Sequence, residues 1–223
     1  MPHTLMKQLT EMKLTGMAAA LSSQMEQPGT YEELSFRERL ALLVTRESLE
    51  RDQRKQKRLL QKARLRLEAS VQDIDYQPAR NLERSRIAQL SQNEWVVRGQ
   101  NLLITGPCGC GKTYVGCALG NNACQQGYSV QYWRLNRLLV ELTHSRADGS
   151  YRKQLAQLSK TQLLILDDWG LEPLLPAQRN DLLELMDDRY GKNATVMISQ
   201  LPTDEWYLSL IHISEPTRRV VIS

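Results

Sequence analysis

The residues best suited to chemistry in this 223-residue chain are the eight consecutive residues Gly106–Thr113. Their order, Gly-Pro-Cys-Gly-Cys-Gly-Lys-Thr, matches the pattern G-x-x-x-x-G-K-[ST] in full. The three glycines let the backbone take positive φ and turn several N–H groups toward one anion. In such a loop Lys112 reaches the β- and γ-phosphates of a nucleotide, and the hydroxyl of Thr113 binds Mg²⁺. The residues predicted to bind the phosphates of ATP are Gly106, Pro107, Cys108, Gly109, Cys110, Gly111, Lys112 and Thr113.

An acidic pair, Asp167 and Asp168, directly follows the apolar run Leu163–Leu166. A site that hydrolyses a phosphate needs a carboxylate near the metal and a group that activates water. We expect Asp167 to bind Mg²⁺ together with Thr113, and Asp168 to polarise the attacking water. Many ATPases of this type carry glutamate at the second position, and the shorter Asp168 reaches less far.

Polar residues also end the apolar run Ala194–Ile198, where Ser199 and Gln200 stand. Either side chain is suited to contact the γ-phosphate or to orient water. We favour Gln200 because its amide both donates and accepts hydrogen bonds. A simple turn leading to Pro202 accounts for the two residues equally well. The predicted catalytic residues are Asp168, Lys112 and Gln200.

Four cysteines fall within one segment, at Cys108, Cys110, Cys117 and Cys124. A zinc site is the alternative to weigh, but two of the four occupy variable positions of the phosphate loop, where a metal would compete with the nucleotide. The other two lie among apolar neighbours. We expect small thiols that are buried or half-buried.

Short apolar runs alternate with helical patterns after Trp95, which is the order typical of a parallel α/β sheet. Continuous apolar runs such as Leu163–Leu166 are typical of strands buried on both faces. The phosphate loop then lies between the first strand and the next helix, whose N-terminus faces the phosphates. Expected strands cover residues 100–105, 129–133, 162–166 and 194–199, and expected helices cover 112–125, 136–145, 152–158 and 177–190.

The first part of the chain predicts helices only. Apolar residues recur at helical spacing with an interruption near Gly16, and a polar break follows at Gln27–Thr30. Ser35 and Glu38 have the spacing of a capping box at the start of a second, longer helix. A short helix is expected at Ser85–Leu90. The expected domains are a helical, basic DNA-binding domain over 1–70, a linker with a short helix over 71–98, and an ATPase domain over 99–207.

The net charge of +4 is located entirely in the first part of the chain. Residues 1–98 carry 17 Lys and Arg against 13 Asp and Glu, while residues 99–223 carry 12 of each. Within Arg51–Arg66, Asp52 is the only acidic residue among eight basic ones, so the run is expected to lack the i,i+4 Glu–Lys pairs that would stabilise a solvated face. A solvated helix face is one explanation, and we prefer neutralisation by the phosphates of double-stranded DNA. The predicted DNA-binding residues are Arg51, Arg54, Lys55, Lys57, Arg58, Lys62, Arg64 and Arg66.

The composition, with 41% apolar and 24% charged residues, is that of a globular protein. The chain contains no uninterrupted run of about 18 apolar residues, the length that a membrane helix needs. Its first residues also lack the apolar core of a secretory signal. We therefore expect no membrane partner, a cytoplasmic location and reduced cysteines.

The order of these motifs resembles the IstB family, ATP-binding helper proteins of bacterial insertion sequences that are related to helicase loaders. The resemblance rests on Met12–Met17, Gly106–Thr113, Leu164–Gly170, Asp188–Gly191 and Ser199–Pro202. It implies a P-loop AAA+ sheet flanked by helices and preceded by a small all-α domain. It also implies an ATPase that uses ATP and Mg²⁺, binds DNA, assembles into a homo-oligomer and helps a cognate transposase to engage its target.

Two alternatives share part of this evidence. A replicative helicase loader carries the same nucleotide motifs, so only the partner distinguishes it from a transposition helper. A small-molecule P-loop kinase has the phosphate loop as well, but such kinases usually lack a separate basic helical domain.

The end of the chain departs from the IstB pattern. Leu208–Arg218 resembles the translated adaptor of transposase-based sequencing libraries. We therefore expect residues 208–223 to be a non-native tail on a C-terminally truncated protein. The native protein would then be longer, and this chain would lack both an arginine finger and the last strand of the sheet.

Overall fold

The computed structural model describes residues 2–76, 82–201 and 217–221. The chain divides into two compact units, residues 1–58 and 59–223. The domain boundary predicted at residue 70 stays a prediction, and residues 59–70 are described below with the larger unit. None of the described helices is long and apolar enough to span a bilayer.

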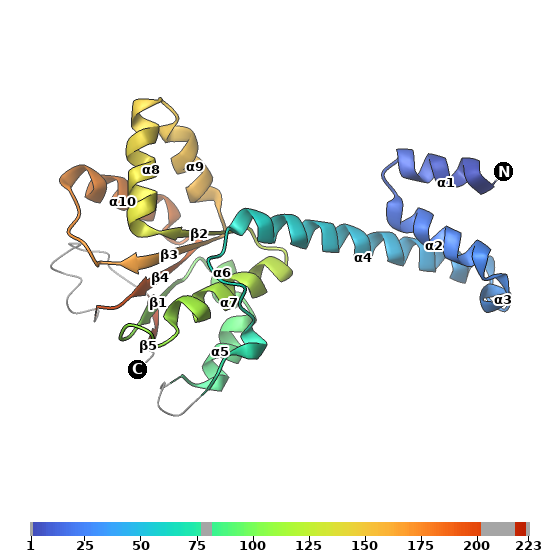
Figure 1. Ribbon diagram of the computed structural model, residues 1–223, viewed down its shortest axis with the longest axis horizontal. Coiled ribbons are helices and arrows are strands. Elements are labelled where there is room, and N and C mark those ends of the chain that lie inside the picture. Colours follow the sequence, from blue (N-terminus) through green and yellow to red (C-terminus); the bar gives the residue numbers. More distant parts are fainter. Residues whose placement is uncertain (1, 77–81, 202–216, 222–223) are drawn as a thin grey trace. The chain divides into compact units, whose positions relative to one another are not determined.

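Five strands of the larger unit form one sheet in the order β2-β3-β4-β1-β5, and each neighbouring pair is parallel (Figure 1). Both faces of the sheet are buried, which explains the continuous apolar runs. Leu163 and Ile165 pack into the core on one face, whereas Leu164 and Leu166 pack into the core on the other. The strands are β1 (Asn101–Thr105), β2 (Val130–Arg134), β3 (Leu163–Trp169), β4 (Ala194–Ser199) and β5 (Thr217–Val221).

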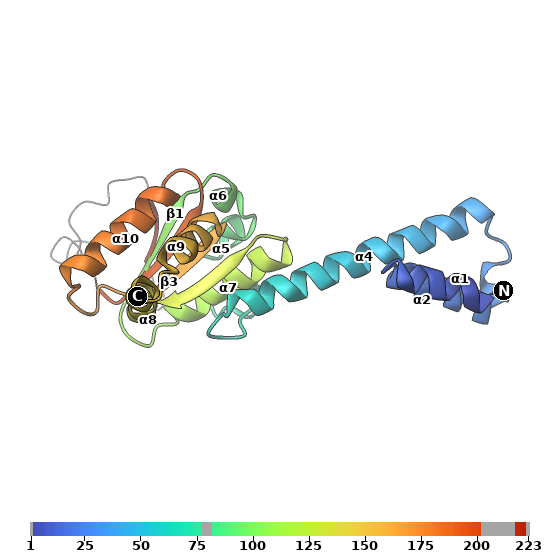
Figure 2. The ribbon, with the colours of Figure 1, turned by 90° about the horizontal axis from the view of Figure 1, so that it is seen from above.

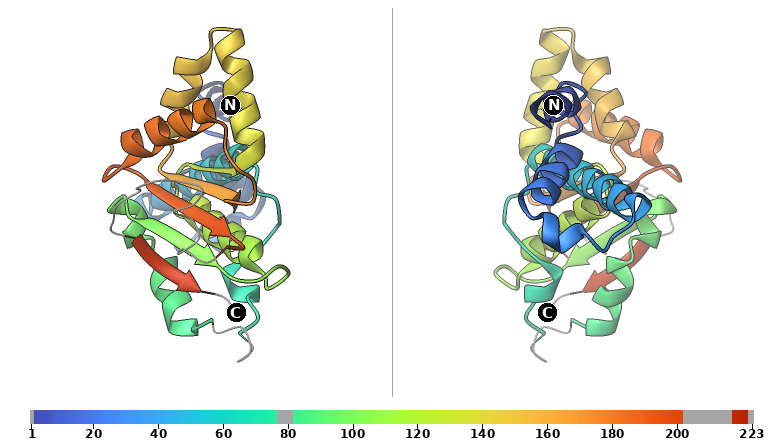
Figure 3. Two further views of the ribbon diagram at one scale, coloured as in Figure 1. Left: turned by 90° about the vertical axis from the view of Figure 1, so that its left-hand side faces the viewer. Right: turned by 90° about the vertical axis from the view of Figure 1, so that its right-hand side faces the viewer.

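Helices cover the two faces of this sheet (Figure 3). The helices α5, α6 and α7 contribute to the core on the Leu163 face, and α8, α9 and α10 contribute to the core on the opposite face. The second group lies nearest the viewer in the view from above (Figure 2). The helices are α5 (Arg84–Ser91), α6 (Glu94–Val97), α7 (Lys112–Gln125), α8 (Leu135–Ala147), α9 (Tyr151–Lys160) and α10 (Pro176–Arg189), with a 3₁₀ turn η1 (Val71–Asp73).

The predicted order of elements in this unit is confirmed. The four predicted strands and the four predicted helices after Trp95 are all present, with ends that differ by a few residues. The short helix predicted at Ser85–Leu90 is α5. Sequence reasoning missed the single helical turn of α6 and the 3₁₀ turn η1, which are too short to show a period.

The expectation that the sheet lacks its last strand is wrong. β5 pairs in parallel with β1, with Leu103 opposite Arg219, and so occupies the edge beyond β1. Residues 202–216, 222 and 223 lie outside the described residues. The non-native origin of residues 208–223 stays a prediction.

A buried arginine fixes the end of α10 to its neighbours. Arg189 is 1% exposed, and its Nη1 donates to the carbonyl oxygens of Leu158 at 2.5 Å and Thr161 at 2.6 Å. Its other nitrogens donate to the carbonyl oxygen of Ala194 and, at 3.0 Å, to Oγ1 of Thr195. Burial lowers the pKa of Arg189 to about 9, so the guanidinium stays charged at neutral pH. One side chain therefore holds together the end of α9, the end of α10 and the start of β4.

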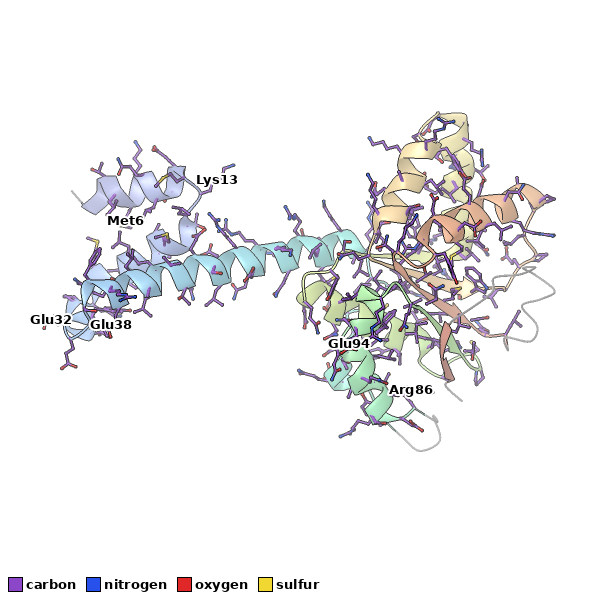
Figure 4. All side chains as sticks on the ribbon, turned by 180° about the vertical axis from the view of Figure 1, so that it is seen from behind. Met6, Lys13, Glu32, Glu38, Arg86 and Glu94 are labelled. Carbon is purple, nitrogen blue, oxygen red and sulfur yellow. The ribbon has the colours of Figure 1, made fainter. Side chains whose placement is uncertain are left out.

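The smaller unit consists of helices, as predicted. The capping box at the start of α4 is confirmed, because the N–H and Oγ of Ser35 donate to Oε2 of Glu38 at 2.8 and 2.6 Å. The polar break predicted at Gln27–Thr30 contains a short helix that begins at Pro28, whose fixed φ suits a first helical position. Glu32 and Glu38 flank the turn that leads into α4 (Figure 4). The helices are α1 (Pro2–Glu11), α2 (Thr15–Glu26), α3 (Pro28–Tyr31) and α4 (Phe36–Ala63).

Glu47 of α4, only 5% exposed, holds the first turn of α2. Its carboxylate accepts hydrogen bonds from the N–H groups of Gly16 at 2.8 Å and Met17 at 3.2 Å, and from Nε of Arg51 at 2.6 Å. Burial raises the pKa of Glu47, but these hydrogen bonds outweigh burial and leave the pKa below its ordinary value. Gly16 permits the contact, because a Cβ at this position would lie 2.7 Å from Cα of Glu47.

Candidate nucleotide-binding site

The phosphate loop connects the end of β1 to the start of α7, as predicted. Gly109 and Gly111 have φ of +81° and +92°, a region that only glycine adopts readily. Apart from the glycine and its two chain neighbours, no heavy atom of the described residues lies within 4 Å of a Cβ built on either residue, so their positive φ, rather than crowding, requires glycine. α7 begins at Lys112, and its first N–H groups have no partner within the helix. The loop therefore presents backbone donors and a helix N-terminus to an anion.

Lys112 lies folded over this loop. Its Nζ donates to the carbonyl oxygen of Pro107 at 2.6 Å and lies 3.7 Å from Sγ of Cys110. The side chain is buried, with an exposed fraction of 7%. A buried ammonium without a carboxylate partner among the described residues is suited to bind a phosphate.

Thr113 and Asp167 are brought together as predicted. Oγ1 of Thr113, in the first turn of α7, donates to Oδ2 of Asp167 at 2.8 Å. β3 is separated from β1 by β4 alone, so the carboxyl end of β3 lies near the phosphate loop. A hydroxyl and a carboxylate are hard oxygen ligands, which is the donor set that Mg²⁺ prefers. The two side chains thus fit the metal that the sequence predicts.

Asp167 also contacts two residues that the sequence analysis did not assign to this site. The hydroxyl of Tyr132, in β2, donates to Oδ2 of Asp167 at 2.6 Å, and Nη1 of Arg66 lies 3.8 Å from the same oxygen. Burial and the neighbouring carboxylate raise the pKa of Tyr132, so its hydroxyl remains a donor at neutral pH. The side chain of Asp167 is only 3% exposed; two hydroxyls donate to its Oδ2, and one guanidinium lies within ion-pair distance.

Asp168 has its own cationic partner. Nε of Arg134, the last residue of β2, lies 2.7 Å from Oδ2 of Asp168. Hydrogen bonding to this carboxylate raises the pKa of Arg134. Asp168 also has a φ of +61°, and its N–H donates to Oδ1 of Asp167 at 2.9 Å. This backbone conformation is rare for a residue with a Cβ, and the two adjacent carboxylates have different partners.

At the end of β4 the two candidate polar residues differ in environment. Oγ of Ser199 is buried, donates to the carbonyl oxygen of Trp169 at 2.8 Å, and accepts from the N–H of Leu201 at 3.0 Å. Ser199 therefore holds the β3–β4 strand ends together. Gln200 is exposed, and its contact with a γ-phosphate stays a prediction.

The cysteines follow the expectation at three of four positions. Cys117 and Cys124 are buried in α7, and Cys110 is half-buried. Cys108 is exposed at the loop surface, where a buried or half-buried thiol was expected. Burial raises the pKa of Cys124 to about 12, which keeps this thiol protonated and unreactive.

The basic run is divided among different environments. α4 ends at Ala63, so Arg64 and Arg66 lie beyond the helix, and Arg66 reaches Asp167. The assumption that the run lacks acidic partners at i,i+4 is wrong, because such partners precede it. Arg51 pairs with Glu47 at 2.6 Å, and Arg54 lies 3.6 Å from Glu47 and 4.0 Å from Glu50. The exposed side chains without a carboxylate within ion-pair distance, among the residues that the structure describes, are those of Lys55, Lys57, Arg58, Lys62 and Arg64.

Comparison with known proteins gives one consistent family. Residues 7–212 match the IstB-like ATP binding protein family. The chain is 46% identical over 202 residues to an insertion-sequence ATP-binding protein of Pseudomonas fluorescens, covering 90% of this chain and 87% of that protein. It is 44% identical over 205 residues to another from Sinorhizobium fredii, covering 92% and 83% of the two chains. The chain therefore belongs to the IstB-like ATP-binding protein family.

Two solved structures with the same fold are proteins of DNA replication. The DnaC helicase loader superposes with a TM-score of 0.61 at 20% identity, covering 70% of this chain and 97% of that one. The replication initiator DnaA bound to AMPPCP and single-stranded DNA superposes with a TM-score of 0.60 at 16% identity, covering 71% of this chain and 51% of that one. At these identities the likeness shows the fold, a P-loop AAA+ sheet flanked by helices.

The role of Lys112 in the phosphate loop can be tested by its substitution. Lys112→Ala removes the buried ammonium, and we expect affinity for ATP to fall at least about thirtyfold, since truncating a buried charged partner costs roughly 2–5 kcal/mol. Titration with a fluorescent ATP analogue measures this loss. Lys160→Ala, which removes an exposed lysine at the end of α9, is the matched control. Equal affinities of the two variants would remove Lys112 from the site.

Proposed function

We propose that this IstB-family chain is an ATPase that binds double-stranded DNA in an ATP-dependent manner and helps a cognate transposase to engage its target. The observation that carries the proposal is the 2.8 Å hydrogen bond between Thr113 and Asp167. It joins the phosphate loop to the acidic strand end that a nucleotide-hydrolysing site requires. A phosphate loop that bound an anion for structural reasons alone would not need this carboxylate.

Each residue of the site has a distinct task in this proposal. The N–H groups of the loop and Nζ of Lys112 bind the β- and γ-phosphates. Thr113 and Asp167 hold Mg²⁺, which supplies positive charge to the phosphates when it is bound. Asp168 orients and deprotonates the attacking water, and Gln200 contacts the γ-phosphate. Arg134 holds the carboxylate of Asp168, so it sets the position of this base without being required to touch the substrate.

DNA binding is supported by the charge distribution on α4. Lys55, Arg58 and Lys62 recur at i, i+3 and i+7, so they lie on one face of the helix. They are exposed, and among the described residues no carboxylate lies within ion-pair distance of them. Phosphates of DNA supply the missing negative charge without base-specific contacts.

Self-assembly is supported by the smaller unit, whose helices expose large apolar side chains. Phe36 is 74% exposed, and Met12 and Val44 are 59% and 54% exposed. Few of the described side chains of this unit are buried, so its helices leave apolar surface that association would cover. We propose a homo-oligomer that forms with the help of these helices.

A transposition helper is preferred over a helicase loader because of the curated relatives. The insertion-sequence proteins are 44–46% identical to this chain over most of its length, whereas the DnaC loader is 20% identical and shares the fold. A small-molecule kinase is less consistent with a separate helical unit that carries unpaired cations.

Hydrolysis is tested at Asp168. Asp168→Asn keeps the size of the side chain but removes the base, so we expect ATP turnover to fall by about 100-fold or more. Affinity for ATP should change little, because the phosphate contacts are intact. Phosphate release and ATP-analogue titration measure the two quantities separately. Asp187→Asn, an exposed position of α10, serves as control, and unchanged turnover in Asp168→Asn would assign the base elsewhere.

DNA binding is tested by its salt dependence. Replacing Lys55 and Arg58 with glutamine removes two phosphate contacts, so the slope of log K against log salt should fall by about 1.8, at about 0.9 per contact. Fluorescence anisotropy with duplexes of two unrelated sequences gives the slope. Glutamine at Lys160 and Lys192 removes the same charge elsewhere. If both double variants keep the wild-type slope, the face of α4 is solvated surface.

The partner is tested by affinity capture. With ATP and DNA present, the tagged chain should retain the transposase encoded beside it, and Lys112→Ala should not. Recovery of a hexameric replicative helicase in place of the transposase would favour the loader.

A further inference from the structure

A cavity of about 530 Å³ lies in the larger unit and does not include the phosphate loop or the acidic pair. Its wall is formed by the last turn of α4, the strand β2 and the helices α8 and α9, which are neighbours in Figure 1. β2 is an edge strand of the sheet, so no further strand covers this side. The volume falls within the roughly 300–1,000 Å³ of cavities that hold a ligand the size of a nucleotide.

The charge of the cavity wall favours an anion. Lys62, Arg64 and Lys153 line it, and Glu141 is the acidic residue of the lining. Among the described residues no ion pair involves any of these four side chains. Three unpaired cations against one carboxylate in a small volume leave positive charge that a phosphate would neutralise.

The rest of the lining suits a nucleobase. Trp133 of β2 is half-buried against the core, so its ring is held in place, and its Nε1 lies 3.5 Å from Oε1 of Gln131. Gln131, Gln154 and Gln157 line the same cavity. An immobilised aromatic ring stacks on any base, and amides both donate to and accept from base edges. Cations, a ring and amides within one cavity are the parts of a nucleotide site.

We propose that this cavity binds one unpaired nucleotide of DNA, with its base against Trp133 and its phosphate against Lys62, Arg64 and Lys153. A base within a duplex is paired at its edge and stacked on both faces, so it must leave the stack before it enters such a cavity. The cavity therefore selects single-stranded or locally opened DNA, in contrast to the face of α4, which neutralises duplex phosphates.

The inference rests on the proposed DNA binding and deepens it. Lys62 belongs to both surfaces, because it is the last member of the basic face of α4 and also lines the cavity. Melting or distortion of the target would supply the unpaired base.

The test compares two probes of equal length, a fluorescein-labelled 15-nucleotide oligothymidylate and a 15-base-pair duplex. Lys153→Gln should weaken binding of the oligothymidylate and lower its salt slope by about 0.7, the value of one phosphate contact on a single strand. Binding of the duplex should stay unchanged. Lys160→Gln removes a lysine from the same helix outside the cavity lining and should affect neither probe.

Trp133 is tested separately. Trp133→Leu should weaken oligothymidylate binding about tenfold, since stacking on one aromatic ring is worth roughly 1–3 kcal/mol. Trp133→Phe should keep most of the affinity for the oligothymidylate, because phenylalanine retains an aromatic face. Binding of an ATP analogue to each variant reports whether the larger unit is folded. If Trp133→Leu fails to fold, Lys153→Gln decides the outcome.

The possible results distinguish the cavity proposal from the proposed DNA-binding function. Wild-type protein that binds the duplex but not the oligothymidylate overturns the cavity and leaves the proposed function intact. Loss of both probes to the same extent in Lys153→Gln also overturns it, because the cavity would not select an unpaired base. Binding of neither probe by the wild type contradicts the proposed DNA-binding function itself. Binding of free thymidine monophosphate with no binding of the oligothymidylate would make the cavity a small-molecule site and overturn its role in DNA binding.

Discussion

The larger unit depends on the contacts of one buried carboxylate, that of Asp167, which joins segments from several parts of the chain. It stands at the end of β3, and its Oδ2 accepts from Thr113 of α7 and Tyr132 of β2 and lies 3.8 Å from Arg66. An ionised carboxylate that is 3% exposed is tolerated only when its hydrogen bonds and charge are satisfied. The phosphate loop, the edge strand and the segment after α4 must therefore meet at this point. Both the proposed binding of Mg²⁺ and the packing of the unit therefore require a carboxylate at this position.

Much of the fold was predictable because its signals are local. The phosphate loop is a contiguous motif, and the β3 run followed by the acidic pair needs only seven residues, Leu163–Trp169, to be recognised. Continuous apolar runs indicate parallel strands because both sheet faces are buried. The capping box of Ser35 and Glu38 spans four residues and was predicted for the same reason.

The partners of the site residues were not predictable, since they come from distant positions. Tyr132 and Arg134 lie 35 and 34 residues before their carboxylates, and nothing in β2 as a sequence marks them as polar groups of the site. The register of the strands brings these residues to the acidic pair, because β2 pairs with β3 such that Arg134 lies opposite Asp167. The edge strand thus delivers two donors to the acidic pair. A composition-based argument also failed at Arg51 and Arg54, whose acidic partners precede the basic run.

Backbone geometry divides a uniform run of charge into groups with different counter-ions. Arg51 and Arg54 are neutralised within the smaller unit by Glu47 and Glu50, so they add little positive field. α4 then ends at Ala63, and Arg64 takes a φ of +51°, so Arg66 no longer continues the helix. Arg66 lies 3.8 Å from Asp167, and its side chain is still 45% exposed, so its predicted contact with DNA stays a prediction. The cations left for a phosphate backbone are those of the exposed helix face and the cavity, and among the described residues none of them forms an ion pair with a carboxylate.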